Sequence, residues 1–192
     1  QKGDVVLCQS LTFIASVNPV LYLGATPVFI GSEKETWNLC PIALEEAILN
    51  QLHKGIQPKA IVVVHLYGMP AKMNEIITIS KKYNIPILED AAEALGSSYD
   101  NQPCGTFGDF GVFSFNGNKI ITTSGGGALI CHSEIDKKKA IFLATQAKED
   151  AVHYEHTQVG YNYRMSNVAA SIGLGQLEVL SEHIQHRKQN HL

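Results

Sequence analysis

One lysine, Lys119, lies where its amine could do chemistry. It follows an apolar segment that ends at Phe115, and it precedes Ile120, Ile121 and a run of Thr, Ser and Gly that ends at Gly127. A lysine on a surface loop normally stays protonated and points to water. A lysine removed from water loses its proton more easily, and its free amine can attack a carbonyl carbon. The immediate neighbours leave both interpretations open.

Asp90 and Ser114 could assist such an amine. Asp90 ends an apolar segment, where it can cap a helix over residues 91–94 or be a buried carboxylate paired with a cation, such as a protonated pyridine nitrogen. Ser114 lies five residues before Lys119, and its hydroxyl can be satisfied within the protein or can bind a phosphate. The glycine run at 124–127 lacks the GxxxxGK[ST] pattern of a P-loop, and it is interpreted as a turn before a strand.

Aromatic and basic residues add further candidates. Phe13 can be a core aromatic, or its flat ring can stack on a flat cofactor. Asn162 and Arg164 lie in the polar and aromatic segment Gly160–Arg164, and they could reach an anion because guanidinium matches phosphate and carboxylate geometry. His153 and His156 lack the HExxH pattern and are interpreted as loop residues, so we predict no metal site.

The elements that must position these residues alternate in type along the first half of the chain. Apolar runs predict strands over residues 4–8, 26–30, 60–66 and 85–88, with a helix after each of the first three, ending near Gly24, Leu52 and Tyr83. This alternation predicts βαβ units, and therefore an α/β fold of three αβα layers around a mostly parallel sheet.

The second half departs from that alternation. Strands are predicted over 109–115 and 128–131 with no helix between them, followed by helices over 133–148 and 168–187. Ligands of open α/β sheets bind beyond the carboxyl ends of the strands. The candidates at those ends are Thr12–Phe13, His65–Tyr67, Asp90–Glu93, Ser114 and Lys119.

Composition narrows the class of protein. The chain has 192 residues, 45% of them hydrophobic, and a net charge of -3, which predicts a globular domain without a basic surface for nucleic acid. No apolar run is long enough to cross a membrane, no secretory signal precedes the first strand, and the four cysteines lack zinc spacing. We therefore expect reduced thiols and a cytoplasmic location. The start without Met and the end inside a helical pattern indicate part of a longer protein.

Six short motifs give the chain a characteristic order and spacing. They are Leu11–Ala15 (LTFIA), Glu89–Glu93 (EDAAE), Gly105–Gly108 (GTFG), Ser114–Lys119 (SFNGNK), Thr122–Gly127 (TTSGGG) and Gly160–Asn167 (GYNYRMSN). Together they resemble the DegT/StrS family of pyridoxal-phosphate-dependent sugar aminotransferases, which have fold type I, the aspartate aminotransferase-like fold. The resemblance covers essentially the whole chain. It implies that residues 1–192 are part of the cofactor-binding large domain, with an upstream phosphate loop and a smaller C-terminal domain outside this chain.

The resemblance implies a role for each matching residue. Lys119 matches the catalytic lysine that links to pyridoxal phosphate and later moves protons. Asp90 matches the partner of the pyridine nitrogen, Phe13 the ring that stacks on the cofactor, and Ser114 a phosphate ligand. Glu93 stands near the phenolic oxygen of the cofactor, where Gln or His is commoner, so it is either protonated or makes a different contact.

The resemblance also implies partners and a reaction. Asn162 matches a residue offered across a homodimer interface to the partner's phosphate, with Arg164 nearby for the anion of the donor or substrate. The implied reaction is a transamination from glutamate to a nucleotide-linked keto-sugar for surface polysaccharide or glycan biosynthesis. Asn116-Gly-Asn118 before the lysine, where many members have a His-Pro type sequence, resembles the branch that aminates UDP-4-keto-6-deoxy-N-acetylglucosamine.

Two alternatives remain. Some relatives are sugar dehydratases in which histidine replaces the lysine, and Lys119 argues against that reaction. A non-catalytic regulatory or scaffold protein of the same fold is the other alternative, which the completeness of the motif set disfavours. The chain by itself is expected to be inactive, because parts of the family's large and small domains lie outside it.

Overall fold

A computed structural model describes residues 1–191. The chain forms two compact units, Gln1–Phe113 and Ser114–Leu192. We refer to them as the first unit and the second unit.

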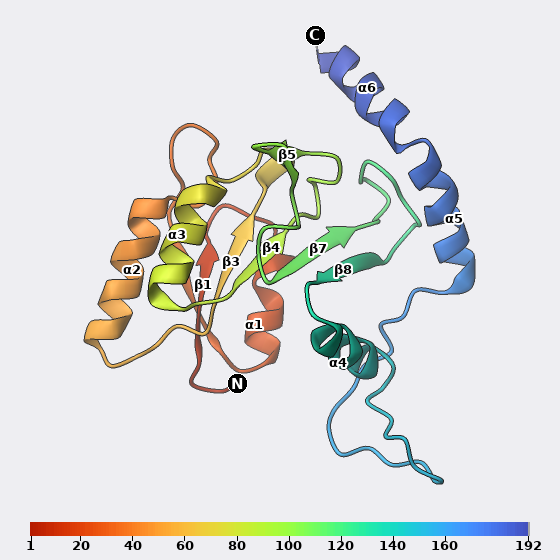
Figure 1. Ribbon diagram of the computed structural model, residues 1–192, viewed down its shortest axis with the longest axis horizontal. Coiled ribbons are helices and arrows are strands. Elements are labelled where there is room, and N and C mark those ends of the chain that lie inside the picture. The colour runs from red at the N-terminus through yellow and green to blue at the C-terminus, as the bar shows by residue number, and fades with distance from the viewer. Residues whose placement is uncertain (192) are drawn as a thin grey trace. The chain divides into compact units, whose positions relative to one another are not determined.

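A parallel sheet forms the centre of the first unit (Figure 1). Its strands lie in the order β2-β1-β3-β4-β7. Their bounds are β1 Val5–Gln9, β2 Thr26–Ile30, β3 Ala60–Val64, β4 Ile87–Asp90 and β7 Phe110–Ser114. Every pairing in this series is parallel, with Val64 beside Asp90 and Asp90 beside Val112. The predicted parallel sheet is confirmed.

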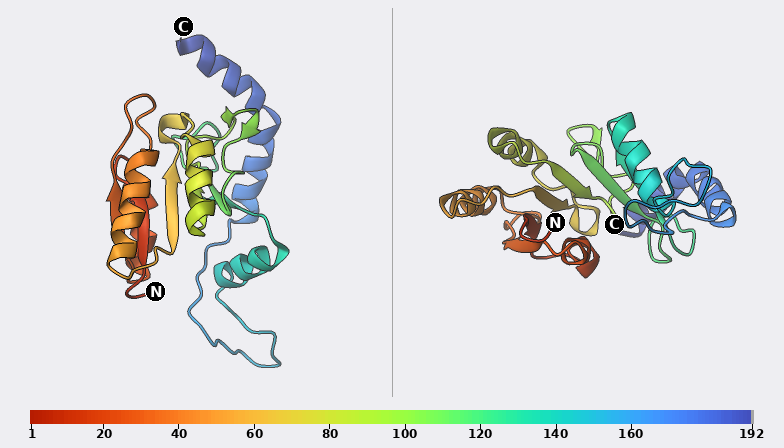
Figure 2. Two further views of the ribbon diagram at one scale, coloured as in Figure 1. Left: turned by 60° about the vertical axis from the view of Figure 1, so that its left-hand side comes forward. Right: turned by 90° about the horizontal axis from the view of Figure 1, so that it is seen from below.

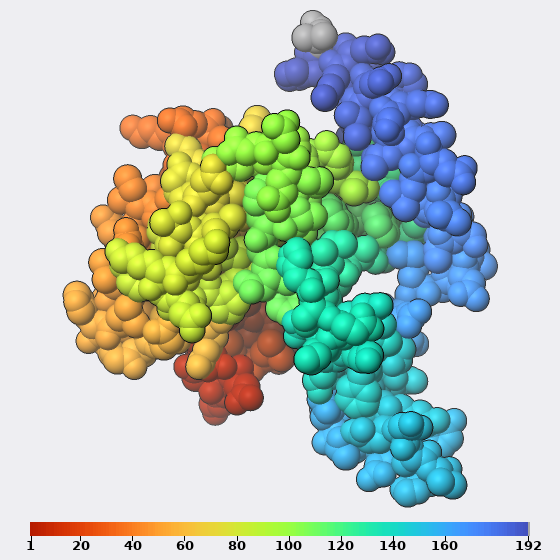
Figure 3. Space-filling model, in the orientation of Figure 1, coloured from red at the N-terminus to blue at the C-terminus, as the bar shows by residue number. Residues whose placement is uncertain are grey.

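Helices cover both faces of this sheet. Helices α2 (Pro41–His53) and α3 (Met73–Tyr83) lie on one face, and α1 (Asn18–Tyr22) lies on the other (Figure 2). In β3, Ile61 and Val63 join the core cluster that holds Leu44 and Ile76, whereas Val62 joins the cluster that holds Val20. Alternate residues of one strand thus bury on opposite faces, and the predicted αβα layering is confirmed. In Figure 3, α2, α3 and the segment after β4 conceal most of the sheet from one side.

The structure differs from the predicted elements at two prolines. The first predicted helix is broken into a 3-10 turn, η1 (Ile14–Ser16), and α1, because Pro19 favours the first turn of a new helix. The strand predicted from Ile85 begins instead at Ile87. Pro86 accepts a hydrogen bond from the Ile61 N–H at 2.9 Å but has no N–H to continue the ladder.

Two short elements of the first unit were not predicted. A 3-10 turn, η2 (Leu66–Gly68), follows β3, and an antiparallel hairpin joins β5 (Ser98–Tyr99) to β6 (Gln102–Pro103). The hairpin turns at Asp100 and Asn101, which both have positive φ angles of 49° and 64°. Asp and Asn tolerate this conformation better than other side chains do.

The second unit contains strand β8 (Gly127–Cys131) and helices α4 (Glu134–Ala144), α5 (Asn167–Glu178) and α6 (Leu180–His191). Ser133 and Ser166 cap α4 and α5, accepting backbone N–H groups at 3.0 and 3.2 Å. Helix α4 ends before the predicted residue 148, because Gln146 and Ala147 adopt left-handed φ angles of 71° and 51°.

No helix among residues 1–191 is long and apolar enough to span a membrane. All four cysteines carry free thiols. Burial raises the pKa of Cys8 to about 11, and burial together with the charge of Glu89 raises the pKa of Cys104 to about 11. These two thiols are therefore protonated at neutral pH.

Candidate active site

Asp90 ends β4, and its half-buried carboxylate is fixed by two donors. Oδ2 accepts the Ser16 hydroxyl at 2.6 Å, and Oδ1 accepts the Ala92 N–H at 3.1 Å. The residues after Asp90 form turns and no helix, so the alternative in which Asp90 caps a helix is wrong. A carboxylate held at the carboxyl end of a parallel strand is well placed to meet a cationic ligand atom.

Phe13 lies directly before η1, the turn whose last residue contacts Asp90. Its side chain is 77% exposed, so the interpretation of Phe13 as a core aromatic is wrong. Ser16 N–H donates to the Phe13 carbonyl at 3.1 Å. The exposed ring therefore belongs to the same turn that holds the Asp90 carboxylate.

Glu93 is fixed against the turn after β3. Its Oε2 accepts the Tyr67 N–H at 2.9 Å. Tyr67 adopts a left-handed φ of 52°, which is uncommon for an aromatic residue and is often found at functional sites. At Gly68, with φ of 81°, an added Cβ would lie 2.8 Å from the Glu93 carbonyl oxygen, so only glycine fits this approach. The structure thus brings Phe13, Asp90 and Glu93 to the strand ends of the first unit.

Glu89, the neighbour of Asp90, has a different environment. It is fully buried and accepts the N–H groups of Gly105, Phe107 and Gly108 at 2.6 to 2.7 Å. It also contacts His65 Nε2 at 2.9 Å. Burial opposes the charge of this carboxylate, but the hydrogen bonds from His65 and the backbone outweigh it and lower the pKa of Glu89.

His65 completes this buried cluster. Its Nδ1 accepts the Ala71 N–H at 3.1 Å, so the ring proton lies on Nε2, where it is donated to Glu89. The imidazole has both nitrogens in use and is buried. His65 is therefore a structural residue, although the sequence placed it among the candidates at strand ends.

Lys119 lies in the second unit on the segment that connects β7 to β8. Its side chain is half-buried. Backbone bonds close the base of the segment, from Phe115 N–H to Gly126 O and from Thr123 N–H to Phe115 O, both at 2.9 Å. Lys119 N–H donates to Asn116 O at 3.0 Å, which defines a tight turn immediately before the lysine.

The residues that follow Lys119 are anchored to two helices of the second unit. Thr122 N–H donates to Gln176 Oε1 of α5 at 3.1 Å, and His183 Nδ1 of α6 contacts the Ile120 carbonyl oxygen at 3.0 Å. The carbonyl oxygen can only accept, so His183 carries its proton on Nδ1. These contacts give the lysine segment a defined position within its unit.

Ser114 is half-buried at the end of β7, and its Oγ lies 3.4 Å from the Asn116 N–H donor. The glycine run forms a turn that leads into β8, with Ser124 and Gly126 at φ of 69° and 98°. This agrees with its interpretation as a turn. Whether Ser114 binds a phosphate stays a prediction.

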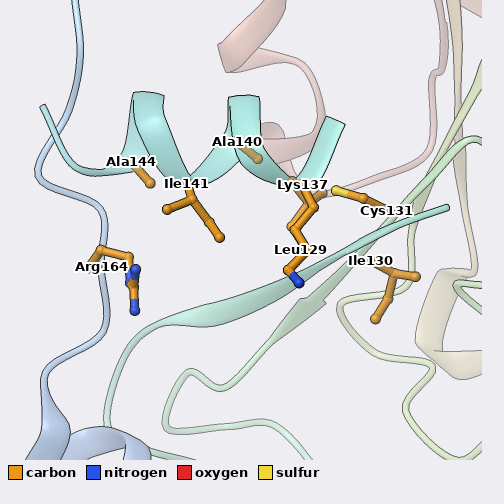
Figure 4. Close-up of a pocket in the computed structure, with 8 residues that line it drawn as sticks. All are labelled: Leu129, Ile130, Cys131, Lys137, Ala140, Ile141, Ala144 and Arg164. Atoms are coloured by element: carbon orange, nitrogen blue, oxygen red, sulfur yellow. The ribbon is translucent and has the colours of Figure 1, made fainter. Parts of the chain in front are cut away.

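Asn162 and Arg164 lie on an extended segment that pairs with the end of α4. Asn162 bridges to Thr145, and Tyr161 and Tyr163 stack at 4.9 Å between ring centroids. Arg164 lines a hollow of about 540 Å³ between β8 and α4, opposite Ile141 and Ala144 (Figure 4). Both polar side chains are exposed, so they can bind groups outside the second unit.

The described residues contain no group of three or more His, Cys, Asp or Glu side chains arranged to hold a metal ion. His153 and His156 lie outside helices and strands. His153 contacts Glu155 at 3.6 Å, and His156 contacts the Gln146 carbonyl oxygen at 3.0 Å. Their interpretation as loop residues is confirmed.

Phe13, Asp90 and Glu93 lie at or beyond the carboxyl ends of strands in a parallel sheet. Open α/β sheets bind their ligands and cofactors in that place. Residues 1–192 match the DegT/DnrJ/EryC1/StrS aminotransferase family. The chain belongs to that family.

Named relatives come from several bacteria. EpsN of Bacillus subtilis (strain 168), described as a candidate pyridoxal phosphate-dependent aminotransferase, is 54% identical over 98% of this chain and 48% of its own length. GDP-perosamine synthase of Escherichia coli O157:H7 is 42% identical over 98% of this chain and 50% of its own. UDP-4-amino-4,6-dideoxy-N-acetyl-beta-L-altrosamine transaminase of Campylobacter jejuni serotype O:2 is 36% identical over 98% and 50%. The chain thus spans about half the length of the relatives it matches.

Solved structures agree with the family. A DegT DnrJ EryC1 StrS aminotransferase from Brucella abortus has a TM-score of 0.89 and 32% identity, covering 94% of this chain and 49% of its own. Spr1654 of Streptococcus pneumoniae, described as a candidate sugar aminotransferase, was solved in a PLP form with a TM-score of 0.86 and 28% identity, covering 98% and 52%. Its PMP form has a TM-score of 0.87. The predicted family and aminotransferase-like fold are confirmed.

Proposed function

We propose that the protein carrying this chain is a pyridoxal-phosphate-dependent aminotransferase that acts on a nucleotide-linked keto-sugar. The observation that carries the proposal is Asp90, a carboxylate fixed by two donors at the carboxyl end of a parallel strand. Membership of the aminotransferase family supports the reaction class. The PLP and PMP forms of Spr1654 support the cofactor.

The residues present fit this cofactor. Asp90 supplies an anion for the protonated pyridine nitrogen, and the exposed ring of Phe13 supplies a flat face. Glu93, held by the Tyr67 N–H, is assigned to the region of the phenolic oxygen, and the Ser114 hydroxyl to the phosphate. When bound, pyridoxal phosphate supplies an electron sink for the substrate carbon next to the transferred nitrogen.

Lys119 is assigned two tasks. Its amine is the group that would hold the cofactor covalently before the substrate arrives. Once displaced, the same amine would take the proton from the α-carbon of the amino donor and carry it to the cofactor carbon. Asp90 would hold the proton on the ring nitrogen of the bound cofactor, which the electron sink requires.

The finer assignment concerns substrates and partners. Glutamate is the proposed amino donor, and the proposed acceptor is UDP-4-keto-6-deoxy-N-acetylglucosamine. A UDP-sugar transaminase among the relatives supports a UDP-linked acceptor. GDP-perosamine synthase is also a relative, so a GDP-linked sugar is the first alternative acceptor to test. A cytoplasmic homodimer is proposed, in which Asn162 reaches the phosphate in the partner and Arg164 binds an anion of donor or substrate.

Replacing the lysine tests the reaction. In the complete protein, Lys119→Ala is expected to bind pyridoxal phosphate without a borohydride-reducible link and to lower turnover by at least about 1,000-fold, because both lysine tasks are removed. Lys138→Ala, an exposed lysine on α4, is the matched control and should keep wild-type turnover. Full turnover of Lys119→Ala would disprove the assignment.

A substrate panel tests the acceptor. The complete protein is incubated with ¹⁵N-glutamate and UDP- or GDP-linked 4-keto sugars, and products are measured by mass spectrometry. The expected product is a ¹⁵N-labelled UDP-amino sugar. Label in a GDP-sugar alone would replace the UDP assignment, and no label in any sugar would reject the sugar aminotransferase proposal.

A further inference from the structure

Ser16 contacts both proposed cofactor-facing residues of the first unit. Its backbone N–H donates to the Phe13 carbonyl at 3.1 Å, and its hydroxyl donates to Asp90 Oδ2 at 2.6 Å. Ser16 itself is half-buried at the end of η1. One residue therefore ties the turn that presents the exposed ring to the carboxylate at the end of β4.

The hydroxyl of Ser16 is part of a chain with a defined direction. Thr12 Oγ1 lies 2.7 Å from Ser16 Oγ. Because the one hydroxyl hydrogen of Ser16 is donated to Asp90, Ser16 must accept the hydrogen of Thr12. The order Thr12 to Ser16 to Asp90 directs both hydroxyl dipoles toward the carboxylate, and hydrogen bonds in such a chain strengthen one another.

Asp90 can accept further donors after these contacts. Oδ2 accepts Ser16 and Oδ1 accepts the Ala92 N–H. Each carboxylate oxygen has two lone-pair directions. The two internal donors therefore fix the plane of the carboxylate, while a further direction on each oxygen stays available for an N–H donor from a ligand.

We propose that Ser16 is a positioning residue that fixes the Asp90 carboxylate relative to the ring of Phe13. Asp90 would then meet the pyridine nitrogen while Phe13 stacks on the face of the same pyridine ring. The inference rests on the proposed function. Ser16 does not itself touch the cofactor in this proposal, because its hydroxyl hydrogen is already used. Without that hydroxyl, the Asp90 carboxylate keeps only the hydrogen bond from the Ala92 N–H, and η1 loses its hydrogen bond to the end of β4.

The test compares Ser16→Ala, Ser16→Cys and Ser16→Thr in the complete protein. Loss of a hydrogen bond to a charged group is expected to weaken pyridoxal phosphate binding by about tenfold or more in Ser16→Ala. Ser16→Cys conserves size but is a weak donor, so it should show a similar loss, and it serves if the alanine protein does not fold. Ser16→Thr retains the hydroxyl and should restore most of the affinity. Ser10→Ala, an exposed serine of the same segment, is the control.

Three readouts separate positioning from general destabilisation. They are the dissociation constant of the cofactor from absorbance titration, the visible circular dichroism of the bound cofactor, and the melting temperature of the apoprotein. A positioning role predicts weaker binding and an altered dichroic band for Ala and Cys, with a restored band for Thr. An unchanged dissociation constant and band in both Ala and Cys, with only the melting temperature lowered, would overturn it.

Asp90→Asn, measured alongside, separates a failure of the proposed cofactor site from a failure of the proposed role of Ser16. If Asp90→Asn weakens cofactor binding and the Ser16 variants do not, the proposed function stands and the role of Ser16 is refuted. If Asp90→Asn leaves both the affinity and the dichroic band unchanged, the assignment of Asp90 fails, and the role of Ser16 fails with it.

Discussion

Replacing Glu89 by glutamine is expected to destabilise the first unit strongly. Phe107 and Gly108 donate to Oε1, each at 2.6 Å, whereas His65 and Gly105 donate to Oε2 at 2.9 and 2.7 Å. A glutamine side chain has one accepting oxygen and one amide nitrogen that carries hydrogens. Whichever oxygen is replaced, two backbone or side-chain donors lose their acceptor and face another donor.

The size of the effect follows from these two lost acceptors. A hydrogen bond to a charged group contributes about 1.5–3 kcal/mol, and breaking a buried charge network costs about 3–5 kcal/mol. We therefore expect Glu89→Gln to lower the free energy of unfolding by about 3–5 kcal/mol. Glu46→Gln, at an exposed position of α2, is the matched control and should change it by less than about 0.5 kcal/mol.

The effect should depend on pH in a defined direction. The pKa of Glu89 in the folded protein lies below its ordinary value of 4.5. The charged carboxylate therefore stabilises the fold above pH 4.5, and this contribution is lost as the pH falls below 4.5 toward the folded pKa. The difference between wild type and Glu89→Gln should be constant from neutral pH to about pH 5 and should narrow at lower pH.

Chemical unfolding of the complete protein, combined with hydrogen exchange of the Gly105, Phe107 and Gly108 amides, measures this effect. Those three amides should lose protection in Glu89→Gln, since they donate to the carboxylate in the wild type. Unchanged amide protection, or a stability difference that does not narrow below pH 4.5, would refute the assignment of Glu89 as a charged structural acceptor.

Two further predictions concern local packing and helix capping. Gly111→Ala would place a Cβ 1.9 Å from the Gly105 carbonyl oxygen, so it should lower the free energy of unfolding by about 3 kcal/mol or more. The control Gly117→Ala, with no neighbour within 4 Å, should change this free energy little. Equal effects of the two substitutions in denaturant titrations would contradict the close packing at Gly111. Ser133→Ala removes the oxygen that accepts the Asp136 N–H at 3.0 Å and should lower the free energy of unfolding by about 1 kcal/mol. Ser133→Asp, which keeps an accepting oxygen, should retain most of the stability. An unchanged melting midpoint in Ser133→Ala would contradict the role of Ser133 as a helix cap.

Sequence patterns predicted the strands of the sheet well, because a strand buried on both faces is a run of consecutive apolar residues. Ala60–Val64 is an uninterrupted apolar run, as expected for a strand covered on both faces. Pro41 lies in the first turn of α2, and Ser133 and Ser166 cap α4 and α5. Residues of these types are helix-start signals. These signals are local, so they can be read without knowing the tertiary structure.

The same patterns could not find Ser16. Its partner Asp90 is 74 residues away, and no spacing rule connects a serine to an aspartate at such a distance. Phe13 and Asp90 were found because each ends or follows a strand, where ligands of α/β sheets collect. A hydroxyl that holds one of them becomes visible only when β1 and β4 are placed in the same sheet.

The adjacent carboxylates Glu89 and Asp90 at the end of β4 have different roles, one structural and one proposed to bind a ligand. Successive side chains of a strand point to opposite faces, so Glu89 and Asp90 meet different surroundings. Glu89 is fully buried with four donors, whereas Asp90 is half-buried with two donors and has lone pairs to spare. The first carboxylate is saturated and can only hold the loop at 105–108. The second is fixed in orientation yet still able to accept, and this combination is what a cationic ring nitrogen requires.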